Sequence, residues 1–232
     1  MSNPRPTVDW LMQLPTNRLM AEISLWSADL GRLEDDTKRI EPFTDIFHVD
    51  VADGHFSRAM LFFPDLLARL RKVTAKPMHV HLMVGDAVLL DQVEQFAEAG
   101  ADLISVQAEN ANALEALALI KTLGLKSGVV LQLHTAVADA AKFVPYIDML
   151  TLLGTLMGIK GVGLDGSAPA RLTEARKLVA GAGRRIIVAA DGGIRDNTVP
   201  RLRAGGAETI VMGSLAFGAP DLAARMAWVH GL

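Results

Sequence analysis

Three short segments of the chain place acidic or imidazole side chains beside β-branched apolar residues: His48-Val-Asp50, His79-Val-His81 and Asp191-Gly-Gly193. Because side chains alternate between the two faces of a strand, the polar residues of each pair share a face and the valine between them points the other way. Burying such groups unpaired costs roughly 1–3 kcal/mol each. A divalent cation held by His and Asp satisfies several of them at once. The spacing therefore predicts a metal site whose carboxylates can also act as acids or bases.

The elements that position these residues follow a regular pattern. From about residue 20 onward, short apolar runs alternate with amphipathic helical segments, which predicts a βα unit repeated eight times. Pro64 suits the first turn of a helix, and Gly100, Gly124 and Gly205-Gly206 follow helical segments where a left-handed residue often ends a helix. The predicted strands cover residues 20–25, 46–51, 78–83, 103–106, 127–131, 149–153, 186–190 and 209–211.

Eight parallel strands can form an open doubly wound sheet or a closed barrel. In a barrel the second and seventh strands face each other across the mouth, so Asp50 and Asp191 could approach a substrate from opposite sides, which favours closure. The 232 residues suit one such barrel. We therefore expect an α/β protein with a single (β/α)8 TIM barrel over residues 1–232. Residues 1–19 form an N-terminal extension in which Trp10 caps the barrel bottom or joins a subunit contact.

Composition excludes several classes of function. Half of the residues are apolar and only 5% are aromatic, as expected for buried parallel strands, and the formal net charge of −3 gives no basic field for nucleic acid. The chain has no cysteine, which excludes disulfides and thiolate chemistry. It shows neither the apolar stretch of a signal peptide nor an apolar run long enough to cross a membrane. We expect a cytoplasmic protein without a nucleic-acid or membrane partner.

In their order along the chain, the motifs resemble the ribulose-phosphate 3-epimerase family from about Glu22 to Phe217. The resemblance lies in residues 24–29, 48–56, 81–84, 99–104, 191–193 and 212–214. It implies a (β/α)8 barrel, with one divalent metal ion held by His48, Asp50, His81 and Asp191. Zn²⁺ suits two imidazoles and two carboxylates, whereas Fe²⁺, Mn²⁺ and Co²⁺ also fit. His79 is expected to be a hydrogen-bonded core residue instead.

The resemblance also implies an activity, which is epimerisation at C3 of a phosphorylated ketose, first D-ribulose 5-phosphate to D-xylulose 5-phosphate. Such an inversion needs two opposed bases around a planar enediolate, and Asp50 and Asp191 match the catalytic carboxylates of the family. The metal would stabilise the enediolate charge. The expected substrate contacts are Ser24, His81, Met83, Gly161, Gly163, Gly192, Gly193, Gly213 and Ser214. The resemblance favours a homo-oligomer, either a dimer or a hexamer.

The chain departs from the family near the strand ends. Gln107 stands where the family usually has His, Ala52 replaces a methionine, and Gln132-Leu-His134 replaces an Asn-Pro pair. The sequences of residues 57–63 and of the glycine-rich residues 154–163 also differ from the family's usual sequence. These changes suggest altered substrate choice, with Arg58 and Lys160 as candidate anion contacts.

Three alternative functions stay open at this point. One is a 3-epimerase of another ketose phosphate, such as allulose 6-phosphate or a tetrulose phosphate. Another is a non-catalytic barrel that binds a sugar phosphate. Lyase or decarboxylase chemistry is disfavoured, because such sites commonly pair a lysine with aspartates at strand ends and no lysine stands there.

Overall fold

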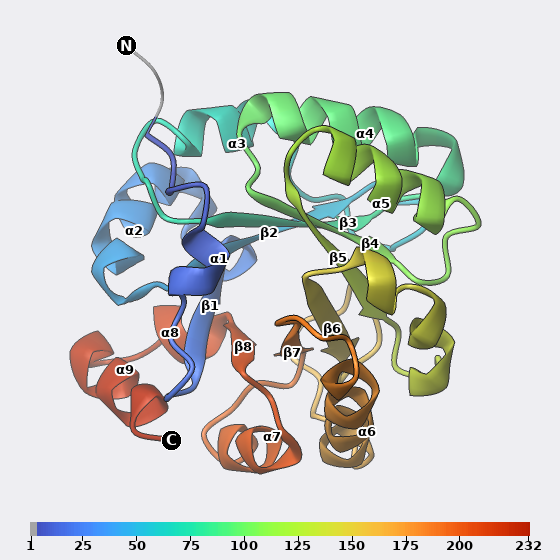
Figure 1. The fold of residues 1–232 in the computed structure, drawn as a ribbon. Helices are drawn as coiled ribbons and strands as arrows, with labels where there is room; N and C mark the ends of the chain where they lie inside the picture. Colours follow the sequence, from blue (N-terminus) through green and yellow to red (C-terminus); the bar gives the residue numbers. More distant parts are fainter. Residues whose placement is uncertain (1–3) are drawn as a thin grey trace.

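The computed structural model describes residues 4–232, within which eight parallel strands close into a barrel (Figure 1). Each strand pairs with the next one along the chain, and the last pairs with the first. The closed barrel is the architecture that the opposed aspartates predicted. The strands are β1 (Met20–Ser24), β2 (Ile46–Ala52), β3 (Met78–Met83), β4 (Leu103–Gln107), β5 (Lys126–Leu131), β6 (Met149–Leu153), β7 (Ile187–Asp191) and β8 (Thr209–Met212).

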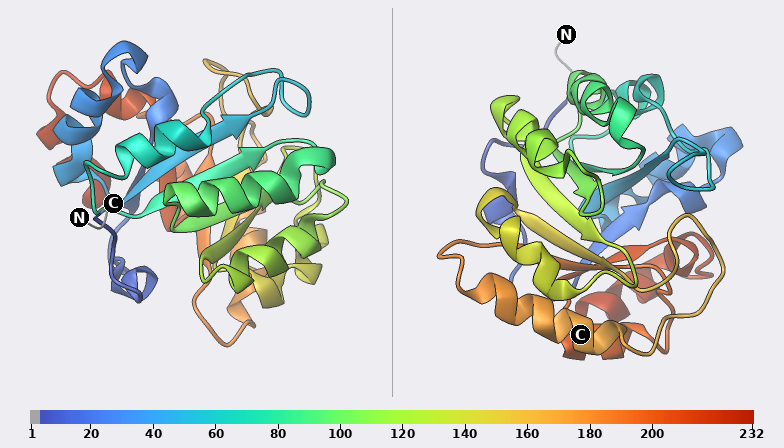
Figure 2. Two further views of the ribbon diagram at one scale, coloured as in Figure 1. Left: turned by 90° about the horizontal axis from the view of Figure 1, so that it is seen from above. Right: turned by 90° about the vertical axis from the view of Figure 1, so that its right-hand side faces the viewer.

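Helices surround the strands in all three views (Figures 1 and 2). The connection from β5 to β6 differs from the predicted helix, because it consists of the 3-10 turns Val137–Lys142 and Val144–Tyr146. Pro145 lies inside the second turn and cannot donate a backbone hydrogen bond. The α-helices are α1 (Trp10–Gln13), α2 (Leu33–Ile40), α3 (Pro64–Leu70), α4 (Asp86–Ala99), α5 (Ala113–Thr122), α6 (Ala168–Ala180), α7 (Val199–Gly205), α8 (Ser214–Phe217) and α9 (Leu222–His230).

Strand limits agree with the predicted ones to within one residue at each end. The shift matters at β7, which starts and ends one residue later than predicted and therefore includes Asp191 as its last residue. Asp191 is aligned with Leu153 of β6. Pairing at this position holds the Asp191 backbone in the sheet, so a rigid element positions its carboxylate.

Several helix termini were predicted from proline and glycine. Pro64 is the first residue of α3, as expected from its fixed φ. Gly100 ends α4 in the left-handed region with φ 115°. The two residues of the Gly205-Gly206 pair differ in conformation. Gly205 is the last residue of α7, and only Gly206 adopts a positive φ.

Two apolar clusters sit on opposite sides of the sheet. The larger one lies between the strands and the surrounding helices and includes Ile23, Phe47 and Val80. The smaller one fills the bottom of the barrel interior, where Trp10 of α1 packs against the inward residues at the strand starts. Trp10 therefore caps the barrel bottom. Residues 1–3 of the expected N-terminal extension lie outside the described residues.

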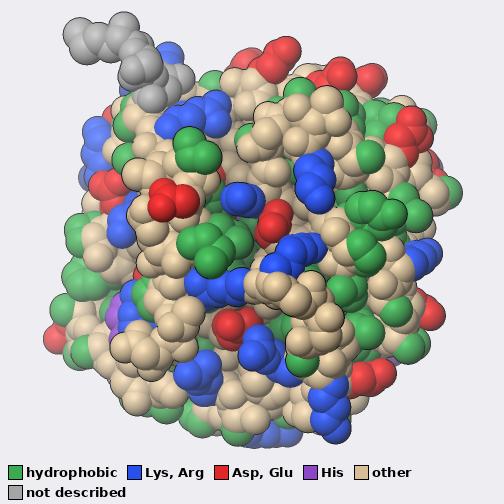
Figure 3. Space-filling model, viewed as in Figure 1, with side chains coloured by type: hydrophobic (Ala, Val, Ile, Leu, Met, Phe, Trp, Pro, Cys, Tyr) green, Lys and Arg blue, Asp and Glu red, His purple; other side chains and the backbone are tan. Residues whose placement is uncertain are grey.

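On the face seen in Figure 3, Lys and Arg side chains are interspersed with Asp and Glu. Among residues 4–232, no helix has both the length and the apolar character that crossing a membrane requires.

Candidate active site

The polar residues predicted from strand alternation all point into the barrel, above the apolar bottom layer. Strand register places them side by side, since Ser24 of β1 is aligned with His48 of β2, and Asp50 of β2 with His81 of β3. Asp191 ends β7 on the opposite side of the barrel. The polar side chains of β2, β3 and β7 therefore lie together at the carboxyl end of the barrel, with Ser24 of β1 beside them, where the active sites of such barrels are found.

One ligand atom from each of His48, Asp50, His81 and Asp191 lies within 4.8 Å of the other three. Nδ1 of His81 lies 3.6 Å from Oδ1 of Asp50 and 3.8 Å from Oδ2 of Asp191. These distances are too long for hydrogen bonds. Within residues 4–232 this buried nitrogen has no hydrogen-bond partner. A divalent ion between two imidazoles and two carboxylates would satisfy it, so the residues present fit a metal ion.

Ser24 and His48 hold the Asp50 carboxylate from two sides. The Ser24 hydroxyl donates a hydrogen bond to Oδ2 at 2.7 Å, and Nε2 of His48 lies 3.2 Å from Oδ1. Asp50 is 5% exposed, so these contacts replace most of its solvent. The carboxylate is therefore fixed in orientation before any substrate arrives.

The two aspartates experience opposite electrostatic environments. Burial raises the pKa of Asp50, but the adjacent His48 and His81 outweigh burial and hold that pKa below its usual range. At Asp191 burial dominates over the attraction of His48, and the Asp50 charge adds to it, so the pKa of Asp191 rises to about 6. Two carboxyl groups whose pKa values are pushed apart are suited to opposite roles in proton transfer.

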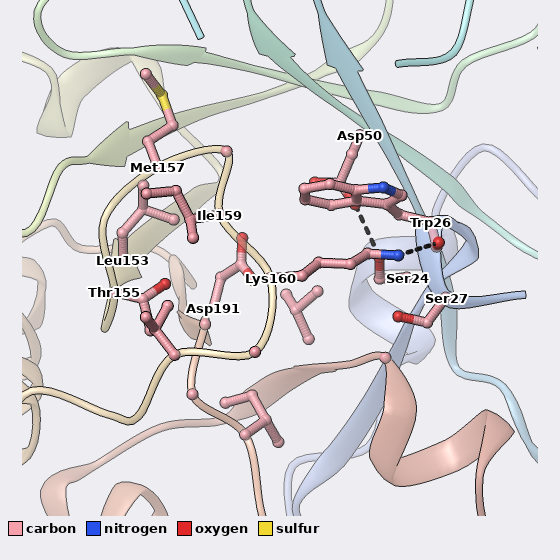
Figure 4. A pocket seen from close by; sticks show the side chains of 18 of the residues that line it. Ser24, Trp26, Ser27, Asp50, Leu153, Thr155, Met157, Ile159, Lys160 and Asp191 are labelled. Carbon is pink, nitrogen blue, oxygen red and sulfur yellow. Dashed lines mark hydrogen bonds between the residues drawn. The ribbon is translucent and has the colours of Figure 1, made fainter. Parts of the chain in front are cut away.

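A cavity of about 320 Å³ opens above the cluster and holds both aspartates in its wall (Figure 4). The substrate-contacting residues expected from the sequence line it with one exception, Gly163, which lies on the loop after β6 but outside the lining. Arg58 also lies outside it. The expected residues in the lining are Ser24, Asp50, His81, Met83, Gly161, Asp191, Gly192, Gly193, Gly213 and Ser214.

Comparison with known proteins agrees with this geometry. Residues 20–217 match the ribulose-phosphate 3 epimerase family. The chain is 32% identical over 211 residues to the ribulose-phosphate 3-epimerase of Bacillus subtilis (strain 168), covering 90% of this chain and 96% of that protein. The chain belongs to the ribulose-phosphate 3-epimerase family. It is therefore classed with the isomerases. The ribulose-phosphate 3-epimerase of Serratia marcescens is 33% identical, with 85% and 95% of the two chains covered.

Solved structures support the fold of this family member. The 3-hexulose-6-phosphate synthase structure superposes with a TM-score of 0.66 at 18% identity, covering 92% of this chain and 98% of that one. Orotidine 5'-phosphate decarboxylase from Pyrococcus horikoshii OT3 gives a TM-score of 0.65 at 15% identity, with 91% and 97% covered. At these identities the likeness establishes the barrel alone.

Two of the departures from the ribulose-phosphate 3-epimerase family pattern are now placed. Gln107 lies at the end of β4, where its Nε2 is 2.6 Å from Nε2 of His81, so it contacts the side of that ring turned away from the carboxylates. Lys160 reaches into the cavity from the loop after β6, and its ammonium lies 4.5 Å from the centre of the Trp26 ring and donates to the Trp26 carbonyl (Figure 4). Burial lowers the pKa of Lys160, which Asp50 partly opposes.

Sequence reasoning missed the fully buried carboxylate of Glu22 on β1. Its Oε1 lies 2.6 Å from Nδ1 of His48 and 2.5 Å from Nδ1 of His79. The signal was available, since Glu22 alternates with Ser24 on the same strand face and a carboxylate inside an apolar strand needs a partner. His79 is the hydrogen-bonded core residue expected, with Ser105 Oγ 2.7 Å from its Nε2. His79 takes no part in the four-residue cluster.

Proposed function

We propose that this chain interconverts D-ribulose 5-phosphate and D-xylulose 5-phosphate by inverting C3 through an enediolate. One observation carries the proposal: Asp50 and Asp191, from opposite sides of the barrel, converge with the imidazoles of His48 and His81, and both carboxylates line one cavity. Membership of the ribulose-phosphate 3-epimerase family supports the choice of reaction. A ketose phosphate is small enough for a cavity of about 320 Å³.

His48, Asp50, His81 and Asp191 would hold the metal ion, for which we propose Zn²⁺ from the mixed nitrogen and oxygen ligand set. The ion supplies positive charge that stabilises the enediolate oxygens as they develop. Ser24 holds the Asp50 carboxylate in place through its hydrogen bond to Oδ2. Asp50 therefore faces the substrate with its orientation already set.

The two carboxyl groups move the proton. In one direction the ionised Asp50 takes the C3 proton from one face of the sugar, and protonated Asp191 returns a proton to the other face. In the reverse direction the roles exchange. Each carboxylate must come within hydrogen-bond reach of the proton it handles, which their places on opposite walls of the cavity allow.

Backbone amides at Gly192, Gly193 and Gly213 are the proposed phosphate contacts. Gly192 and Gly193 have φ values of 86° and 70°, in the left-handed region that glycine adopts readily. A Cβ at Gly193 would lie 2.6 Å from the Cα of Leu164, so a side chain has no room there. Glycine at position 193 is therefore required by the packing against Leu164, and the proposal of a phosphate contact is supported by the place of these glycines in the cavity lining.

The test follows deuterium from solvent into C3. In D2O, the Zn²⁺-loaded protein should convert D-ribulose 5-phosphate to the C3 epimer carrying deuterium, and Asp50→Asn and Asp191→Asn should each abolish conversion. Asp196→Asn is the matched control, because this carboxylate pairs with Arg225 on the surface. Full conversion by Asp191→Asn, or no turnover by the loaded wild-type protein, would refute the two-base proposal.

A second candidate substrate is favoured by Lys160, whose ammonium lies within the cavity wall. An added cation beside the substrate could select a ketose phosphate of different length. A panel of C4 to C6 ketose phosphates, each followed by solvent deuterium at C3, separates the candidates by their kcat/KM values. A non-catalytic barrel would bind members of the panel without exchange at C3.

A further inference from the structure

The barrel interior contains a second polar cluster directly below the metal cluster. Glu22, His48 and His79 each offer a ligand atom within 4.8 Å of the others. All three are completely buried. Their atoms are already joined by short hydrogen bonds, so this cluster is a hydrogen-bonded network rather than a second ion site. His48 belongs to both clusters and connects them.

The hydrogen bonds define which atom of each residue carries a proton. Oε1 of Glu22 accepts from Nδ1 of His48 and from Nδ1 of His79, while Oε2 has no partner within residues 4–232. A carboxylate that receives two N–H groups on one oxygen is ionised. His79 in turn receives the Ser105 hydroxyl at Nε2, which completes the chain of donors. Glu22 is thus held at Oε1 by both imidazoles.

The hydrogen bond to Glu22 decides which ring nitrogen of His48 is available to bind an ion. Nδ1 carries the proton donated to Glu22, so Nε2 is the nitrogen left to ligate an ion, and the proton that Nε2 donates to Asp50 in the metal-free protein leaves when the ion binds. Nε2 is the nitrogen that faces Asp50, at 3.2 Å from its Oδ1. Ligating histidines commonly donate their other ring N–H to a carboxylate, which fixes the tautomer and raises ligand basicity.

We propose that Glu22 is a positioning residue that sets the tautomer and orientation of His48 for metal binding. The inference rests on the metal site of the proposed function. Glu22 does not line the cavity, and among the four candidate ligands it is hydrogen-bonded to His48. His79 holds the Glu22 carboxylate through the same oxygen, Oε1.

The experiment measures Zn²⁺ affinity by competition with a chelator in three variants. Glu22→Leu removes the acceptor and should lower the affinity roughly 10- to 100-fold, the usual range for such contacts. Glu22→Gln keeps an amide oxygen in the same place and should lie between Glu22→Leu and the wild type. Ser105→Ala is the control, because it removes one hydrogen bond of the same buried network without touching Glu22 or His48, and it should stay within about threefold.

A spectroscopic measurement on the wild-type protein gives an answer even if a variant does not fold. Two-bond proton–nitrogen couplings in the Zn²⁺-loaded protein should show His48 protonated at Nδ1 and ligated through Nε2. A proton at Nε2 would overturn the proposal. Equal affinities in wild type and Glu22→Leu, or equal losses in Glu22→Leu and Ser105→Ala, would overturn it as well.

The two proposals fail in different ways. If the wild-type protein binds no Zn²⁺, the proposed metal site and the role of Glu22 fall together. If it binds one ion tightly and Glu22→Leu binds it equally well, the metal site stands and only the role of Glu22 is wrong.

Discussion

Asp50 and Asp191 show how environment separates two identical side chains. The first is paired with imidazoles and a hydroxyl, whereas the second has only longer contacts with His81. At Asp191 burial outweighs the attraction of His48 and His81, so the pKa is raised to about 6. We expect the buried Asp191 carboxylate, placed for the proposed proton transfer and metal binding, to lower the free energy of unfolding when no metal is bound.

This cost predicts a pH-dependent gain from Asp191→Asn in the metal-free protein. Because the folded-state pKa is raised, the protonated carboxyl stabilises the fold at low pH, and that stability is lost as the pH rises through about 6. Urea denaturation in a chelator should give similar free energies of unfolding for variant and wild type near pH 4. By pH 7 the variant should be more stable, by on the order of 1–3 kcal/mol.

The comparison has its own control. Asp196→Asn removes an exposed carboxylate and should track the wild type across the whole range. A constant difference between Asp191→Asn and the wild type from pH 4 to pH 7 would show that the Asp191 carboxyl is not destabilised by burial.

The backbone conformation of the turn after β7 requires a glycine at position 193. The loop after β6 has no such requirement at Gly163. Gly193 has φ 70° and its missing Cβ faces the Leu164 backbone. Gly163 has no heavy atom within 4 Å of a built Cβ, and its φ lies outside the left-handed region. The two residues carried the same predicted role, but only one of them lies at the cavity.

Gly193→Ala should therefore lower the free energy of unfolding by more than about 1 kcal/mol, and it should raise the KM for a ketose phosphate. Gly163→Ala, the matched substitution, should leave both unchanged. Thermal unfolding and steady-state kinetics on the two variants check this. Equal effects of the two substitutions would contradict the assignment of Gly193 to the phosphate contacts.

The strands could be predicted closely because buried parallel strands form continuous apolar runs that turns interrupt clearly. Alternation then placed His48, Asp50 and His81 on one face, and the order of motifs supplied Asp191. The role of Glu22 depends on partners 26 and 57 residues away, which no local pattern shows. The contact between Lys160 and Trp26 spans 134 residues and arises only from the path of the loop after β6.

At the scale of the whole molecule, the barrel interior combines an apolar lower part with a polar upper part. Trp10 and Leu11 close the bottom. The upper layers hold buried carboxylates, which repel one another and attract the buried imidazoles. A bound ion would join β2, β3 and β7 through four ligands. The global stability of the protein should therefore respond to the metal.

Zn²⁺ at about 100 times its Kd should add about 2.7 kcal/mol to the free energy of unfolding, and removing it with a chelator should reverse the gain. The midpoint of thermal unfolding with and without Zn²⁺ measures this. Asp50→Asn, which lacks one proposed ligand, should show a much smaller response. An unchanged midpoint for the wild type in excess Zn²⁺ would argue against a site within the fold.

The order of the strands also has a consequence for biosynthesis. Three members of the cluster lie between residues 48 and 81, whereas the fourth, Asp191, ends the seventh strand. A nascent chain on the ribosome therefore carries most of the donor atoms long before it can assemble the complete set. The proposed four-ligand site is complete only after β7 emerges and docks beside β6, so we expect ion binding to add its full stabilisation late in folding.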